Sequence, residues 1–365
     1  MRLSDFDYTL PEDLIAQEPA TPRDAARLLA LDRRTGRRLH RRFTDLPGLL
    51  RSGDLLVVND TRVLPARLRG RRAAPGASAA IEVLLVEELS GETARGATSG
   101  RIWRALARGV RQEGEPLAFG SGINGRVIRK EDDGAILLEL SAGGAGDGLD
   151  ALLAREGEMP TPPYITRAAD DPRAEDDRQR YQTVYAERPG ALAAPTAGLH
   201  FTPEVLAALR RAGVEVAALT LHVGVGTFQP IRVEEIERHR MLPERCRVPG
   251  AVAEAIARAR ARSGRVVAVG TTVTRALESH ADGDGLVRPG ESSCDLFIHP
   301  GHAFKVVDAL LTNFHLPRST PLLLACAFAG REALLAAYAK AVARRYRFFS
   351  YGDSMLLADL PDEGA

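Results

Sequence analysis

The pattern of apolar residues changes twice along this chain, and these changes limit the folds that it can adopt. From about Pro65 to Gly143, short alternating or β-branched segments such as IEVLLVEEL and NGRVIRK are separated by Gly, Pro and Asp, without a helical period. Short strands at this spacing are typical of a small barrel or sandwich. On either side, helical and strand-like segments alternate, as in α/β folds. We therefore predict a mixed α/β domain from residues 1–64 and 150–365, with an inserted all-β, barrel-like domain at 65–149.

Turn and capping residues predict the elements of the α/β part. The segments RLLALD and RRLHRRF, joined by a turn at Thr35-Gly36, predict a β-hairpin. Thr202-Pro203 supplies the N-cap and the first residue of a helix. The other expected elements are helices at Ala251–Arg262, at Arg331–Arg345 and from Thr271-Thr272, and strands at Leu55–Val58, VEVAALTLHV, RVVAVG, CDLFI and DALLTNF.

Charge and cysteine usage exclude several classes of protein. The 365 residues carry a formal net charge of only +1, so a positive surface for nucleic acid would have to be local. The N-terminus is too acidic for a signal peptide, and the apolar run Ser319–Gly330 is too short for a membrane span. Cys246, Cys294 and Cys326 show neither CxxC spacing nor a His at metal-ligand intervals. We expect a soluble, cytoplasmic protein with reduced thiols and no metal.

Six segments place polar residues and glycines where strands would otherwise end. Four of them directly follow a predicted apolar strand. Because ligands gather outside the carboxyl ends of strands in α/β sheets, these segments predict a cleft for a nucleotide-like ligand. The six segments are Asn59–Arg62, Pro195–Phe201, His222–Phe228, Gly270–Thr272, Thr312–Pro317 and Phe348–Asp353.

The glycines of HVGVGTF have two interpretations. Gly224 and Gly226, after a strand, would let the backbone approach a nucleotide. A Rossmann site would need a helix to begin at once and a third glycine, whereas Pro230 favours extended chain. A tight loop without a ligand explains the pair equally well.

His200, His222 and His315 stand at candidate loop positions beside large apolar residues. A histidine in such a setting is more often a hydrogen-bonded core residue than a general base. The presence of three such histidines in candidate loops favours a functional cleft that includes some of them, but it does not single out any one of them. A structural and a catalytic role are both open for each.

A row of arginines begins the predicted insertion, in RVLPARLRGRR. On a strand, Arg67, Arg69 and Arg71 share one face, because side chains alternate with period two. Such a row suits phosphate contacts that give affinity without base readout. A solvated edge that discourages pairing between sheets is the alternative.

Taken in order, these segments resemble the S-adenosylmethionine:tRNA ribosyltransferase-isomerase family. The resemblance covers almost the whole chain and is weakest between about Arg71 and Gly146. Several motifs of seven or more residues in order are far more specific than one glycine loop. The segments that carry it include FDYTLPEDLIAQEP, GDLLVVNDTRVLPARL, MPTPPYI, YQTVYAERPGALAAPTAGLHFT, LTLHVGVGTFQPIRVEEIERHRM, VVAVGTTVTRALES, HPGHAFKVVDALLTNFHLP and YRFFSYGDSMLL.

The resemblance implies transfer and isomerisation of the ribosyl group of S-adenosylmethionine, the co-substrate, onto 7-aminomethyl-7-deazaguanine at the tRNA wobble position. The implied products are epoxyqueuosine-tRNA, adenine and methionine, and no metal is needed. The family fold is an α/β domain for S-adenosylmethionine with an inserted β-barrel, whose arginines would grip the anticodon stem-loop. No membrane and no obligate protein partner are expected.

Roles for individual residues follow from the same resemblance. The sulfonium acidifies the adjacent C5′ hydrogen, so a modest general base could remove it. We expect His200 or His222 as this base, with Asp60 or Asp353 near the sulfonium or the amine. The expected cofactor-binding residues are Asn59, Thr196, Gly198, Gly224, Gly226, Thr227, Thr271, Thr272, Asn313 and His315, and the expected tRNA contacts are Arg62, Arg67, Arg69 and Arg71.

Two rival functions predict different products. An S-adenosylmethionine-dependent methyltransferase would form S-adenosylhomocysteine and release no adenine. A non-catalytic RNA-binding protein would bind tRNA without turnover. The number of polar strand ends in one part of the fold argues against the second rival.

Overall fold

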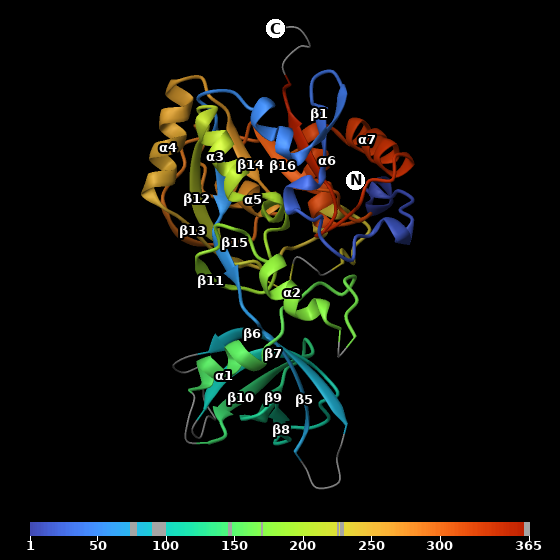
Figure 1. Ribbon diagram of the computed structural model, residues 1–365, viewed down its shortest axis with the longest axis vertical. Coiled ribbons are helices and arrows are strands. Elements are labelled where there is room, and N and C mark those ends of the chain that lie inside the picture. The colour runs from blue at the N-terminus through green and yellow to red at the C-terminus, as the bar shows by residue number, and fades with distance from the viewer. Residues whose placement is uncertain are drawn as a thin grey trace. The chain divides into compact units, whose positions relative to one another are not determined.

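The computed structural model describes residues 1–73, 79–89, 100–144, 148–168, 171–224, 226 and 230–360. The chain divides into two compact units (Figure 1). The larger comprises Met1–Arg62, Pro162–Thr166 and Arg180–Ala365, and the smaller comprises Val63–Thr161 and Arg167–Gln179. The predicted fold class, mixed α/β with a closed antiparallel barrel, is confirmed.

The larger unit is built on a mixed sheet. Within the described residues, the sheet has nine strands in the order β15 (Gly290–Cys294), β13 (Glu244–Val248), β12 (Glu215–Leu221), β3 (Leu55–Asn59), β14 (Val266–Val269), β16 (Ala309–Asn313), β17 (Ser354–Ala358), β1 (Arg27–Asp32) and β2 (Arg38–Arg42). A small second sheet pairs β4 (Thr61–Val63) with β11 (Arg188–Ala191).

The four strands β12, β3, β14 and β16 are neighbours and run parallel. Their carboxyl ends therefore meet at one edge of the sheet, and each is followed by one of the polar segments. β17 runs antiparallel to β16, so the residues that precede β17 reach the same edge. The fold thus gathers five of the six polar segments near one edge.

Strands β3 and β14 are continuous apolar runs, LLVV and VVAV, because both faces of the sheet are covered. On one face, Leu56 and Val58 pack with Phe43, Phe201 and Leu209 in the main hydrophobic core. The helices are α1 (Leu149–Glu156), α2 (Arg173–Arg180), α3 (Pro203–Arg211), α4 (Gly250–Ala261), α5 (Thr271–Ser279), α6 (Thr320–Ala329) and α7 (Arg331–Ala343).

Local signals account for most of these boundaries. Helix α3 begins where expected, because the Thr202 hydroxyl accepts the backbone N–H of Val205 at 3.3 Å. The predicted hairpin is confirmed as β1 and β2. No helix among the described residues is by itself long and apolar enough to cross a membrane; α6 and α7 pass that test only as a pair, bent by 115°.

The strand expected at CDLFI is wrong in position. The paired strand is β15, which ends at Cys294. At its last residue and beyond it, the carbonyls of Cys294 and Leu296 accept hydrogen bonds from the Arg275 guanidinium, at 3.1 and 2.9 Å. A buried side chain therefore replaces the neighbouring strand that these residues would otherwise pair with.

The smaller unit is a closed barrel. Gly70 is required where the strands β5 (Arg67–Arg72) and β8 (Pro116–Phe119) approach, because a Cβ there would lie 2.3 Å from the Ala118 carbonyl oxygen. The barrel order is β10 (Ala135–Ala142), β7 (Arg101–Arg108), β6 (Ala80–Leu89), β5 (Arg67–Arg72), β8 (Pro116–Phe119) and β9 (Ile123–Lys130).

Candidate active site

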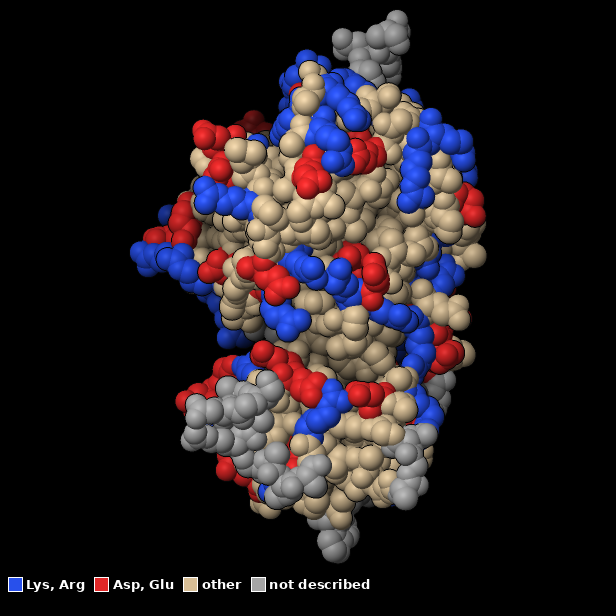
Figure 2. Space-filling view, turned by 90° about the vertical axis from the view of Figure 1, so that its left-hand side faces the viewer, with Lys and Arg blue, Asp and Glu red and all other residues tan. Residues whose placement is uncertain are grey.

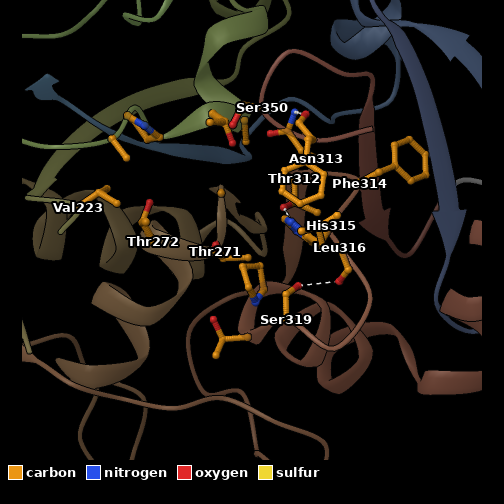
Figure 3. Close-up of a pocket in the computed structure, with 18 of the residues that line it drawn as sticks. Val223, Thr271, Thr272, Thr312, Asn313, Phe314, His315, Leu316, Ser319 and Ser350 are labelled. Carbon is orange, nitrogen blue, oxygen red and sulfur yellow. Dashed lines mark hydrogen bonds between the residues drawn. The ribbon is translucent and has the colours of Figure 1, made fainter. Parts of the chain in front are cut away.

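A cavity of about 490 Å³ lies in the larger unit, at the carboxyl ends of β14 and β16. In Figure 3, Thr271 and Thr272 at the start of α5 lie on one side of it, and Asn313 at the end of β16 and His315 after that strand lie on another. Apolar atoms form most of the wall, between the polar side chains of several threonines and serines, one asparagine, one histidine and one arginine. The predicted cofactor-binding residues that line the cavity are Thr196, Thr271, Thr272, Asn313 and His315.

The side-chain amide of Asn313 is the most informative polar group of this wall. Its Nδ2 donates to the Phe349 carbonyl oxygen at 3.2 Å, and a carbonyl can only accept, so the orientation of the amide is set. The opposite atom, Oδ1, has no hydrogen-bond partner among the described residues, although Asn313 is only 2% exposed. A buried acceptor without a partner costs about 1–3 kcal/mol, which a ligand N–H could recover.

His200 lies behind Asn313 rather than in the lining of the cavity. Its Nε2 is 3.2 Å from Asn313 Nδ2 and accepts from it, because Nδ2 carries only protons. Burial lowers the pKa of His200 to about 4, opposed by a hydrogen bond to the Arg23 backbone. This imidazole is therefore neutral at pH 7 and holds the Asn313 amide.

His315 lines the cavity and is also neutral at pH 7. Burial lowers its pKa to about 3. Its Nε2 is 2.8 Å from the Thr312 hydroxyl, and its backbone N–H donates to the Tyr338 hydroxyl at 3.0 Å. The His315 ring is thus held at the wall in one orientation.

A second polar cluster stands at the ends of β3 and β12. The Nδ1 of His222 is 2.9 Å from the Thr61 hydroxyl, and burial lowers the pKa of His222, as do Arg245 and Arg188. The Thr220 hydroxyl donates to Asp60 Oδ1 at 2.6 Å, and burial raises the pKa of Asp60. Neither His222 nor Asp60 is among the described residues that line the cavity.

Two predicted site residues, Asn59 and Asp353, use their polar side-chain atoms in hydrogen bonds within the protein. Asn59 bridges β3 to the end of β12, donating to the Leu221 carbonyl at 2.9 Å and accepting its N–H at 3.0 Å. Asp353 accepts the backbone N–H groups of Arg27 and Arg347, each at 2.8 Å, and pairs with the Arg27 guanidinium. These contacts hold strand ends and turns in place.

The predicted glycines serve close packing and a backbone contact. A Cβ at Gly198 would lie 2.2 Å from the Tyr185 hydroxyl oxygen. The N–H of Gly224 donates to Glu244 Oε1 at 2.9 Å, and Glu244 pairs with Arg275 of α5 at 2.5 Å. Gly226 is not among the described residues that line the cavity. Thr227 lies outside the described residues.

Sequence reasoning missed several wall residues. Tyr164 and Phe349 pack edge to face, with ring centroids 4.1 Å apart, and both line the cavity. Ser319 and Thr320 stand at the start of α6 and also line it. The sequence Ser-Thr-Pro is a helix-start signal that could have identified α6, whereas nothing local in PPYI marks Tyr164.

The predicted tRNA-contacting arginines differ in their surroundings. Arg67 donates to the Thr161 carbonyl at 2.7 Å, and Arg69 pairs with Glu158 at 3.0 Å. Arg62 and Arg71 are exposed and form no ion pair with any described residue. On the face shown in Figure 2, basic and acidic side chains are interspersed, in keeping with the net charge of +1.

No group of three or more His, Cys, Asp or Glu side chains among the described residues is arranged to hold a metal ion. Cys246, Cys294 and Cys326 are buried free thiols.

The fold and the cavity define an α/β protein with an inserted barrel and a cavity of small-molecule size at the carboxyl ends of its parallel strands. A family model described as queuosine biosynthesis protein matches residues 3–357. A protein from Anaeromyxobacter sp. (strain Fw109-5), named S-adenosylmethionine:tRNA ribosyltransferase-isomerase, is 55% identical over 360 residues, covering 98% of this chain and 99% of its own. One of the same name from Moorella thermoacetica is 51% identical, covering 98% of this chain and its own full length.

A solved structure is also similar. The crystal structure of S-adenosylmethionine tRNA ribosyltransferase from Thermotoga maritima is 37% identical, with a TM-score of 0.52, covering 97% of this chain and 99% of its own. The chain therefore belongs to the S-adenosylmethionine:tRNA ribosyltransferase-isomerase family of queuosine biosynthesis. The resemblance seen in the sequence is confirmed.

Proposed function

We propose that this chain transfers and isomerises the ribosyl group of S-adenosylmethionine onto 7-aminomethyl-7-deazaguanine at the wobble position of tRNA. The products are epoxyqueuosine-tRNA, adenine, methionine and a proton. The observation that carries the proposal is the cavity at the ends of β14 and β16, in a chain whose relatives share about half of their residues over the full length.

The cavity fits S-adenosylmethionine in size and in chemistry. A volume of about 490 Å³ lies in the range of sites for ligands of that size. The rings of Tyr164 and Phe349 offer faces that attract a sulfonium cation or stack with adenine. Asn313 Oδ1 and the Thr272 hydroxyl, both buried without a partner among the described residues, supply polar contacts that the protein itself leaves unused.

We assign different tasks to the two candidate bases. His200 is a positioning residue that orients Asn313, because its ring nitrogens are engaged by Asn313 and by the Arg23 backbone. His222 is the candidate general base, because its Nε2 has no hydrogen bond to any described residue. The bound sulfonium supplies the acidity of the C5′ hydrogen, so that a weak base suffices.

Asp60 is a better candidate than Asp353 for the carboxyl group near the sulfonium or the amine. Asp353 is surrounded by Arg27 and two backbone N–H groups, which occupy its acceptor positions. The raised pKa of Asp60 makes its protonated form easier to reach, which suits a group that exchanges protons with the amine or with adenine.

For the tRNA, Arg62 and Arg71 are the candidate phosphate contacts. Arg67 and Arg69 are partly neutralised by Glu82 and Glu158, so a phosphate would have to compete with these carboxylates. The barrel would then contribute tRNA affinity through Arg71, and the larger unit through Arg62.

One incubation tests the proposal against both rivals. The protein is mixed with labelled S-adenosylmethionine and tRNA that carries 7-aminomethyl-7-deazaguanine, and the small products and the modified nucleoside are identified by mass. Equal amounts of adenine and methionine support ribosyl transfer. S-adenosylhomocysteine without adenine would indicate a methyltransferase, and binding without turnover a non-catalytic protein.

The candidate base is tested in the same assay. His222→Ala is expected to lower adenine release by about 100-fold or more, whereas His200→Ala acts by releasing Asn313 and raises KM more than it lowers kcat. Near-normal turnover in both variants would remove both histidines from the mechanism.

A further inference from the structure

Two helices begin at the same part of the cavity wall. Gly270, Thr271 and Thr272 at the start of α5, and Ser319 and Thr320 at the start of α6, all line the cavity (Figure 3). Thr271, Thr272 and Thr320 also border a second cavity of about 20 Å³, so the two helix starts are neighbours.

Neither helix start is capped by a described side chain. Gly270, the N-cap of α5, has no side chain to offer, and the Ser319 hydroxyl donates instead to the Leu316 carbonyl at 2.7 Å. The first backbone N–H groups of a helix lack partners within the helix and carry a partial positive charge. In α6, Pro321 at the second position has no N–H, so the donors of this start are the N–H groups of Thr320 and Leu322. Two such ends at one wall form a place for an anion.

The Thr272 side chain supplies an independent indication of a ligand. Thr272 is 8% exposed and lines the cavity, yet its Oγ1 has no hydrogen-bond partner in the described part of the chain. A buried hydroxyl without a partner is costly. This hydroxyl lies in the first turn of α5, beside the uncapped N–H groups, and could donate to the same anion.

The rest of the wall limits the kind of anion. Of the described lining residues, only Arg318 carries a charge at pH 7, and it is exposed and paired with Asp7. Helix starts bind carboxylates and phosphates alike, but a singly charged carboxylate needs less compensating positive charge than a dianionic phosphate in a wall with so little charge. At the β16 side, the free Asn313 Oδ1 accepts hydrogen bonds and would repel an anion.

We propose that the paired starts of α5 and α6, with the Thr272 hydroxyl, bind the α-carboxylate of the methionyl end of S-adenosylmethionine. The assignment rests on the proposed function, which puts that substrate in the cavity. It gives the bound molecule a direction: the carboxylate faces α5 and α6, and N–H donors of the ligand face Asn313.

The experiment compares two ligands by calorimetry on the full chain without tRNA. One is S-adenosylmethionine, and the other is its decarboxylated form, which keeps the sulfonium, the adenosine and the amino group. We expect the decarboxylated ligand to bind at least about tenfold more weakly, since a charge-assisted contact is lost. Equal affinities would overturn the carboxylate site but leave the proposed substrate intact. Failure of both ligands to bind, also when tRNA whose wobble base lacks the reactive amine is present, would overturn the proposed function as well.

A variant assigns the effect to Thr272. Thr272→Val keeps the shape and removes the hydroxyl, and we expect it to weaken S-adenosylmethionine about fivefold and the decarboxylated ligand hardly at all. Ser279→Ala is the matched control, because it removes an exposed hydroxyl from the other end of α5, where Ser279 bonds only within its own turn and to His280. Equal weakening of both ligands by Thr272→Val would overturn the assignment.

Discussion

The ion pair of Glu244 with Arg275 ties the segment after β12 to helix α5. Glu244 accepts the Gly224 N–H with one oxygen and pairs with Arg275 through the other, and the two side chains are only 3% and 8% exposed. In Glu244→Gln, the side-chain amide oxygen can still accept the Gly224 N–H. The side-chain NH₂ group then faces the Arg275 guanidinium, and because both are hydrogen-bond donors, no bond can form between them. Loss of one member of a buried pair typically costs about 3–5 kcal/mol.

Arg275 keeps part of its stabilisation in the variant, because the Leu296 and Cys294 carbonyls still accept from it. We therefore expect Glu244→Gln to lower the free energy of unfolding of the larger unit by about 2–4 kcal/mol. Urea unfolding with two probes measures this. Far-UV circular dichroism follows the helices α3–α7 of the larger unit, and fluorescence of Trp103, the single tryptophan, follows the barrel.

The dichroism transition should move to lower urea while the Trp103 transition stays in place. A double-mutant cycle with Arg275→Met should recover at least about 1 kcal/mol in the double variant, because no unpaired charge then remains. Glu254→Gln, which breaks an exposed pair on α4, is the control and should change stability by less than about 0.5 kcal/mol. A loss below about 1 kcal/mol in Glu244→Gln would refute the reasoning.

Three further predictions concern pH, tRNA and a buried carboxylate. The folded pKa of His200, about 4, lies below its usual 6.5, so the unfolded chain takes up the proton first as pH falls. The stability that the neutral His200 contributes is therefore fully present above about pH 6.5 and declines toward pH 4, by up to about 1.4 kcal/mol per pH unit. The urea midpoint, measured between pH 7.5 and 5, should fall less steeply in His200→Gln than in the parent protein. An identical fall in both proteins would contradict this prediction. Arg62→Ala and Arg71→Ala should each reduce the salt slope of tRNA binding by about 0.7–0.9, whereas Arg69→Ala should leave it nearly unchanged; unchanged slopes in all three would make these arginines ordinary surface residues. Asp353→Asn should lower the free energy of unfolding by about 2 kcal/mol, with adenine release per folded molecule within about threefold of the parent; a much larger loss of turnover would show that Asp353 acts in the reaction.

Sequence reasoning succeeds where the deciding signal is local. Thr202 caps α3 through its own hydroxyl, and the β3 and β14 runs are apolar because each strand is covered on both faces. The strand prediction at CDLFI is wrong because this segment is as apolar as a strand, whereas its backbone carbonyl at Leu296 accepts a hydrogen bond from the side chain of Arg275, which is distant in sequence. A pattern of apolar residues carries no record of such a contact.

The location of the polar segments was predictable from the sequence. Polar residues after four apolar strands meet at one edge because those strands are adjacent and parallel, which the α/β pattern implies. Their tasks were not predictable, because each depends on a hydrogen bond to a residue far along the chain. Asn59, which we expected in the cofactor site, bridges to Leu221, and Asp353, which we expected as a catalytic carboxylate, accepts from Arg27.

The two histidines of GLHF and NFHL illustrate the limit. Each stands between large apolar residues, so sequence alone treats them alike. In the structure His315 lies at the cavity wall, while His200 meets Asn313 from behind. Because the Phe349 carbonyl and His200 both accept hydrogen bonds from Asn313 Nδ2, the amide is oriented so that Oδ1 remains available to a ligand. The free acceptor at this wall therefore depends on three chain segments, those of Asn313, Phe349 and His200. Substitution of His200 should first lower the affinity for the ligand, because Asn313 is then no longer held in this orientation.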